Sequence, residues 1–214
     1  MTGLWGMAPM HSPDSSAAFV PGERSILLDL AQRSICHGLE NASPLPVNPA
    51  SYSEKLRQAR ASFVTLHRLG DLRGCIGHLA AIQPLVMDVS ENAFAAAFRD
   101  PRFAPLERNE LAGLELQISV LTPATPIEFS SEAELLESLQ PGIDGLILKL
   151  GRQQGTFLPS VWESLPDSRS FLDHLKLKAG LPRDYWSDQI LVFRYQTESF
   201  ASPFQTTAVT PSEE

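Results

Sequence analysis

The stretch FVTLHRLGDLRGCIGH, residues 63–78, decides the fold of this chain. Its first five residues favour a β-strand, Gly70 and the aspartate after it suit a tight turn, and residues 72–78 favour a second strand. The stretch therefore predicts an antiparallel hairpin. Further along, residues 114–120 alternate apolar and polar side chains, which is typical of a strand with one buried and one polar face.

Helical patterns and further strands surround this hairpin. Apolar periodicity and capping residues predict helices over residues 23–39, 53–60, 84–100, 131–140 and 170–179. Strands are predicted over residues 145–150, 155–158 and 190–195. Because helices and hairpins alternate without a regular βαβ rhythm, we expect an α+β fold with a mostly antiparallel sheet flanked by helices.

The chain is expected to form one domain over residues 21–200. Its 214 residues suffice for one large domain or for two small lobes that share a core. Residues 1–20 lack periodicity, and residues 201–214 are rich in Ser, Thr, Pro and Glu, so we predict that both ends are disordered.

Composition and charge exclude several functional classes. The formal net charge of -8 removes the broad positive field that non-specific binding to nucleic acid or to an anionic membrane needs. No run approaches the roughly 18 apolar residues of a membrane span, and no Lys or Arg precedes Arg24, so the expected location is cytoplasmic. Two cysteines and five dispersed histidines show no metal-ligand spacing, and we expect neither a metal nor a cofactor.

Cys75 is the best candidate for a nucleophile. The glycines at positions 74 and 77 flank it, and glycines inside a strand mark a bulge or a close approach of backbone, so Gly74 and Gly77 are candidate binding positions. On a regular strand, Arg73 would share a face with Cys75 and favour its thiolate form. The alternative is that Cys75 is simply a small buried core residue.

Other candidate site residues lie in separate segments. His67 could reach the Cys75 strand across the hairpin, and Asp100 or Glu115 could act as acid or base if they face the same cleft. Arg102 and Thr156 are candidate binding residues. For each of them a structural role is the alternative, such as Asp100 accepting hydrogen bonds within its own turn.

Six motifs in a fixed order resemble the AMMECR1 domain over about residues 24–196. They are LRGCIG (72–77), AAFRDPRFAPL (96–106), LELQISVL (114–121), PGIDGLIL (141–148), GTFLPSVW (155–162) and LKAGLP (177–182). The resemblance implies an α+β fold with a smaller second lobe and a cleft near RGCIG. It also implies two partners, a Memo-like protein and a radical SAM protein of the AmmeMemoRadiSam system, but no established activity. The chain itself has no CxxxCxxC motif for an iron-sulfur cluster.

Two functions therefore remain open at this stage. The first is an enzyme, or an enzyme subunit of a modification pathway, with Cys75 as the thiolate. The second is a non-catalytic adaptor or ligand-binding module. A pocket that holds Cys75 together with Arg73 and a carboxylate would favour the enzyme, whereas a buried thiol without polar neighbours would favour the adaptor. For protein partners, we expect an exposed apolar patch around Phe157, Pro159 and Trp162; the alternative is that this segment is part of the core.

Overall fold

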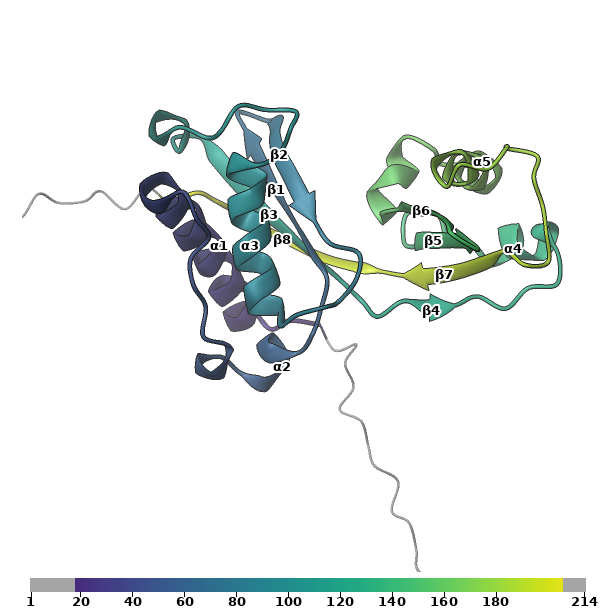
Figure 1. Ribbon diagram of the computed structural model, residues 1–214, viewed down its shortest axis with the longest axis horizontal. Coiled ribbons are helices and arrows are strands. Elements are labelled where there is room, and N and C mark those ends of the chain that lie inside the picture. The colour runs from purple at the N-terminus through teal and green to yellow at the C-terminus, as the bar shows by residue number, and fades with distance from the viewer. Residues whose placement is uncertain (1–17, 206–214) are drawn as a thin grey trace, which may run out of the picture.

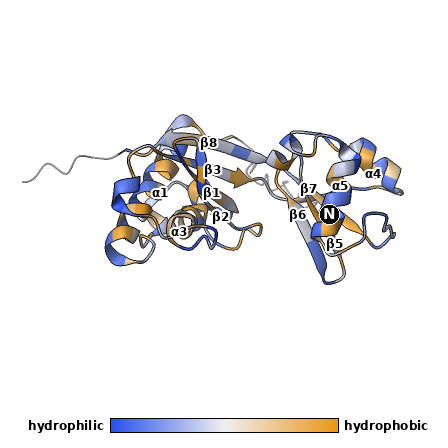
Figure 2. Ribbon diagram, turned by 90° about the horizontal axis from the view of Figure 1, so that it is seen from above, coloured by the Kyte–Doolittle hydropathy of each residue, from blue (hydrophilic) through white to orange (hydrophobic). Residues whose placement is uncertain are grey.

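A computed structural model describes residues 18–205 and shows two lobes, each built on a four-stranded antiparallel sheet (Figure 1). Helices pack on both sheets, so the predicted α+β fold with a second lobe is confirmed. Figure 2 shows the same two lobes from above. The predicted disorder of residues 1–17 and 206–214 lies outside the described residues.

The large lobe is a sheet with two long helices on one face (Figure 1). The strands, in spatial order, are β2 (Asp71–Gly77), β1 (Ser62–Arg68), β3 (Leu114–Leu121) and β8 (Thr197–Pro203). The long helices are α1 (Pro21–Asn41) and α3 (Leu85–Phe98), and three short ones are η1 (Pro49–Ser51), α2 (Glu54–Arg57) and η2 (Arg108–Glu110). No helix in residues 18–205 has the length and apolar character needed to cross a bilayer.

Strict alternation of side chains places the core of this lobe between sheet and helices. Val64 and Leu66 of β1, with Leu116 and Ile118 of β3, are fully buried in the cluster that includes α1 and α3. Their neighbours along each strand point to the opposite face. That second face, which carries polar side chains, is left open for a site.

The predicted hairpin of β1 and β2 is confirmed, but its register shifts. Leu66 pairs with Gly74, while the next residue, His67, pairs with Leu72, so Arg73 is an extra residue in β2. Such a β-bulge reverses the faces used by the residues before it. The prediction that the arginine shares a strand face with the thiol is therefore wrong, because it assumed a regular strand.

The small lobe holds the second sheet, in the order β4-β7-β5-β6. Its strands are β4 (Thr125–Pro126), β5 (Gly145–Leu150), β6 (Gln153–Phe157) and β7 (Leu191–Tyr195). Its helices are α4 (Glu132–Ser138), η3 (Pro159–Glu163) and α5 (Ser168–Lys178). Ser131 caps α4 by accepting a hydrogen bond from the Glu134 amide, as its sequence predicts.

Trp162 is a core residue of the small lobe. It is 3% exposed, its ring stacks on Phe171 with centroids 3.8 Å apart, and its Nε1 donates to the Asp144 carbonyl at 2.7 Å. Phe157 packs edge-on against the same Phe171 ring. The expectation of an exposed patch centred on Trp162 is therefore wrong, because this aromatic segment fills the lobe's own core.

Strand β8 is a structural element that the sequence did not predict. It pairs with β3 from Thr197 to Pro203, and beyond it Phe204 is buried and donates its amide to the Leu114 carbonyl at 2.8 Å. At the other end, Phe19 is buried and its amide donates to the Glu198 carboxylate. The boundaries at residues 20 and 200 are therefore wrong by a few residues, since the folded domain includes residues 18–205.

Two extended segments join the lobes, from β3 to β4 on the way out and from β7 to β8 on the return (Figure 1). Between the lobes lies an apolar cluster, here called the linker cluster, made of Ala61, Leu121, Ile147 and Tyr195. Phe63, Leu79, Leu158 and Phe193 pack against it. The linker cluster buries apolar surface from both lobes, which favours one arrangement of the two.

Candidate active site

The open face of the large sheet carries polar side chains in rows around Cys75. In one row Cys75 lies opposite Thr65 of β1, which in turn lies opposite Gln117 of β3. In the next row His67 of β1 lies opposite Glu115 of β3. Residues two apart on a strand share a face, so these five side chains point to the same side of the sheet.

The small lobe covers part of this face and leaves a cleft of about 400 Å³. The volume lies within the range of small-molecule sites. Large-lobe residues lining the cleft are Phe63, Thr65, His67, Leu72, Cys75, Arg102, Gln117, Ser119, Thr197 and Ser199. The small lobe contributes Leu158, Pro159, Ser160 and Glu163.

Cys75 is half-buried in this cleft and is held from three sides. The Thr65 hydroxyl donates a hydrogen bond to its Sγ at 3.3 Å. The Cys75 amide donates to Asp100 Oδ2 at 2.8 Å, and Arg102 Nη2 donates to the Cys75 carbonyl at 3.3 Å. The thiol therefore has polar neighbours and a fixed backbone, unlike an inert core cysteine.

Asp100 holds Arg102 beside the thiol. Asp100 is 4% exposed, and it accepts from Arg102 Nε at 2.9 Å, from Nη2 at 2.6 Å and from the Arg102 amide at 3.1 Å. These bonds, led by the one from the guanidinium, hold the pKa of Asp100 well below its usual range. A carboxylate that stays ionised in this way is suited to positioning rather than to proton transfer.

Arg102 is available to a ligand of the cleft. Its side chain is 53% exposed despite the pairing with Asp100. Its pKa is raised mainly by the hydrogen bond to Asp100, and to a smaller extent by the Cys75 thiol next to it. A planar guanidinium with exposed donors binds carboxylate or phosphate groups well.

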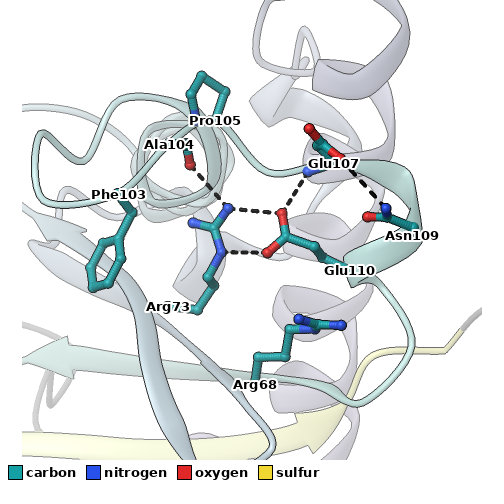
Figure 3. Close-up of a pocket in the computed structure, with 8 residues that line it drawn as sticks. All are labelled: Arg68, Arg73, Phe103, Ala104, Pro105, Glu107, Asn109 and Glu110. Carbon is teal, nitrogen blue, oxygen red and sulfur yellow. Dashed lines mark hydrogen bonds and ion pairs between the residues drawn. The ribbon is translucent and has the colours of Figure 1, made fainter.

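Arg73 lies instead in a separate pocket of about 570 Å³ behind the bulge (Figure 3). Its Nε and Nη2 donate to the two Glu110 oxygens at 2.8 and 2.9 Å, and Nη2 also donates to the Ala104 carbonyl at 2.9 Å. The hydrogen bond from Arg73 lowers the pKa of Glu110 to about 2. Figure 3 shows the pair with Phe103 on one side and Arg68 below it. No residue that lines this pocket also lines the cleft.

The two glycines beside Cys75 are required by close packing. A Cβ on Gly74 would lie 2.1 Å from the Ala96 carbonyl oxygen, so only glycine lets α3 approach the strand this closely. A Cβ on Gly77 would lie 2.4 Å from the Ser62 carbonyl oxygen and equally close to the Phe63 ring. The predicted close approach is thus present, and its partners are protein atoms.

The remaining candidates are divided between the cleft and other places. His67 lines the cleft, whereas Glu115 is exposed on the same face beyond the lining. Thr156 lies in β6, where its hydroxyl donates to the Leu146 carbonyl at 2.8 Å, so it supports the small-lobe sheet. Ser160 and Glu163 were not selected from sequence, because only the folding of one lobe onto the other brings them to Cys75.

Fold and site together define a two-lobed α+β protein with a cysteine–arginine cleft between its lobes. The family model AMMECR1 matches residues 28–200, and the chain belongs to this family. A protein from Methanothermobacter thermautotrophicus is 36% identical over 184 residues, covering 83% of this chain and 93% of the relative. One from Methanopyrus kandleri is 38% identical over 181 residues, covering 81% of this chain and 86% of the relative. The crystal structure of an uncharacterized protein from Pyrococcus horikoshii matches with a TM-score of 0.71 and 34% identity, covering 83% of this chain and 90% of that one.

Proposed function

We propose that this protein is a thiol-dependent enzyme, or the thiol-bearing subunit of one, that acts on an anionic substrate in the inter-lobe cleft. The observation that supports it best is the joint presence of Cys75, Arg102 and Glu163 in one cleft. The criterion from the sequence named Arg73, which lies in another pocket. The cleft holds Arg102 instead, and a thiol, an arginine and a carboxylate in one pocket support chemistry over an adaptor role.

The residues divide into distinct roles in this proposal. Arg102 binds the anionic group of the substrate, and Asp100 positions that guanidinium. Cys75 Sγ forms a bond to an acyl carbon of the substrate, and the bond from that carbon to its leaving group breaks with its electron pair. His67, one row away on the same face, takes the thiol proton and returns it to the leaving group.

The partners implied by the resemblance complete the proposal. We place the protein in a modification pathway with a Memo-like protein and a radical SAM protein, where it contributes the thiol step. Part of the cleft wall comes from the open sheet face of the large lobe and part from η3 of the small lobe. A substrate handed over by a partner would therefore enter between the lobes.

Thiol alkylation tests the proposal directly. With iodoacetamide at pH 7, Cys75 should react faster than Cys36, because burial raises the pKa of Cys36 and makes its thiolate scarcer. Replacing Arg102→Met should slow Cys75 at least threefold and leave Cys36 unchanged, as peptide mass spectrometry would show. The matched control is Arg33→Met, an exposed arginine on α1, which should change neither rate.

Two outcomes would count against the enzyme. Equal alkylation rates for the two cysteines in the native protein would mean that the cleft does not activate its thiol. The second outcome concerns the Cys75→Ser variant. If this variant still captures the Memo-like partner and the complete three-protein system turns over at an unchanged rate, the adaptor function is favoured.

A further inference from the structure

A second pocket lies between the lobes and shares no lining residue with the Cys75 cleft. Its volume is about 320 Å³, and the linker cluster forms one of its walls. Most of its lining is apolar, with Leu79 and Leu121 from the large lobe and Ile147 from the small lobe. The pocket is therefore a small, largely apolar space at the junction of the lobes.

One charged side chain lines this apolar pocket. Arg60 is 7% exposed, and within residues 18–205 its guanidinium forms no ion pair or side-chain hydrogen bond. None of its nitrogens is among the fully buried, unpartnered side-chain atoms of that range, so its donors remain accessible from the pocket that Arg60 lines. Burial alone lowers its pKa, and no neighbouring carboxylate opposes that effect. Two half-buried arginines differ, since Arg73 pairs with Glu110 and Arg194 with Asp144.

An arginine in this position can bind a partner that enters the pocket. A guanidinium that is largely withdrawn from water but still accessible from a pocket is stabilised by a counter-charge bound there. The guanidinium keeps its charge at any physiological pH. The group that would satisfy it is an anion, and the pocket next to it is the space where an anion can enter.

We propose that this pocket binds a small aliphatic monocarboxylate, with its carboxylate on Arg60 and its chain against Leu79, Leu121 and Ile147. One guanidinium matches one carboxylate, whose two oxygens can accept two parallel hydrogen bonds. A phosphate dianion would leave one negative charge unpaired among apolar side chains. The apolar walls add affinity for a hydrocarbon chain, and the volume limits that chain to a few carbons.

This proposal does not depend on the thiol chemistry of the cleft. Its test is titration calorimetry of the full-length protein at pH 7 with sodium butyrate, sodium hexanoate, hexanamide and inorganic phosphate. Hexanoate should bind roughly fifteenfold more tightly than butyrate, because it has two more CH₂ groups and each buried CH₂ strengthens binding about fourfold. Hexanamide and phosphate should bind at least tenfold more weakly than hexanoate.

Variants of the arginine separate this site from non-specific binding. Arg60→Met should weaken hexanoate binding roughly ten- to hundredfold, and Arg60→Lys, which keeps the charge without the planar fork, should lie between it and the native protein. Arg57→Met, at an exposed arginine three residues earlier, is the matched control and should bind as the native protein does. Circular dichroism and the thermal midpoint check that Arg60→Met is folded.

The results that would overturn the proposal are equally definite. They are the absence of saturable hexanoate binding, phosphate binding as tight as that of hexanoate, or unchanged hexanoate affinity in a folded Arg60→Met protein. Alkylation of Cys75 is a separate readout, so either proposal can fail alone.

Discussion

Replacing Glu110 by glutamine tests whether the Arg73–Glu110 ion pair stabilises the folded protein. The hydrogen bond from Arg73 keeps the folded-state pKa of Glu110 at about 2, compared with its ordinary 4.5. At about 1.4 kcal/mol per pKa unit, the ionised carboxylate contributes roughly 3 kcal/mol to the free energy of unfolding at pH 7. Because the folded pKa is the lower one, this contribution is complete above the unfolded pKa and is lost as the pH falls through the folded pKa, leaving under about 1 kcal/mol at pH 2.5.

The assay is urea unfolding of the native protein and Glu110→Gln at pH 7, 4 and 2.5. The gap in unfolding free energy should narrow from roughly 3 to under about 1 kcal/mol across that range. Glu107→Gln, in the same pocket but without an arginine partner, should stay within about 0.5 kcal/mol of the native protein. A gap that is equally large at pH 7 and 2.5, or below about 0.5 kcal/mol at pH 7, would refute the reasoning.

Three further substitutions test packing. Gly74→Ala should lower the free energy of unfolding by at least about 2 kcal/mol in urea titrations, because its Cβ would clash with the Ala96 carbonyl oxygen. Native-like stability of this variant would show that α3 can move away from the strand at little cost. Trp162→Ala should lower the free energy of unfolding by about 3–5 kcal/mol, because it removes a core side chain. A stable variant that lost only partner binding would instead support an exposed binding patch at this residue. Glu132→Gln should lower the free energy of unfolding by about 3 kcal/mol, since it removes the nearer carboxylate of the buried Lys176 ammonium and leaves only Asp173 at 3.9 Å; an unchanged thermal midpoint would contradict this.

Much of the fold was predictable because its strong elements carry local signals. The alternation over residues 114–120 and the turn at Gly70 each specify their structure without tertiary help. Strand β8 was not predictable in this way, because Phe200 is its one buried apolar residue and pairing with β3 supplies the rest. Edge strands of this kind depend on a partner strand that is distant in sequence.

The site was predictable only in part. Cys75 was recognisable from its flanking glycines, yet Arg73 was assigned to it in place of Arg102, because one extra residue in β2 reverses the strand face. The glycines around Cys75 indicated a bulge or a close approach, but they did not indicate which residue of the strand is the extra one. Arg102, held by the turn at Asp100, donates to the backbone carbonyl of Cys75, a contact that spans 27 residues of sequence. Such contacts follow from tertiary structure and leave no local periodicity.

The two segments that join the lobes also show that the small lobe is a module inserted into the large one. The whole small lobe lies between two neighbouring antiparallel strands, since Leu121 at the end of β3 pairs with Thr197 at the start of β8. The Thr122 amide donates to the Gln196 carbonyl at 2.8 Å, so the chain leaves and re-enters at the same point. The small lobe is thus an insertion in what would otherwise be a β-hairpin. A chain in which a short reverse turn replaces residues 123–195 would keep the four strands of the large sheet. It would lose, in a single step, every cleft residue that η3 supplies.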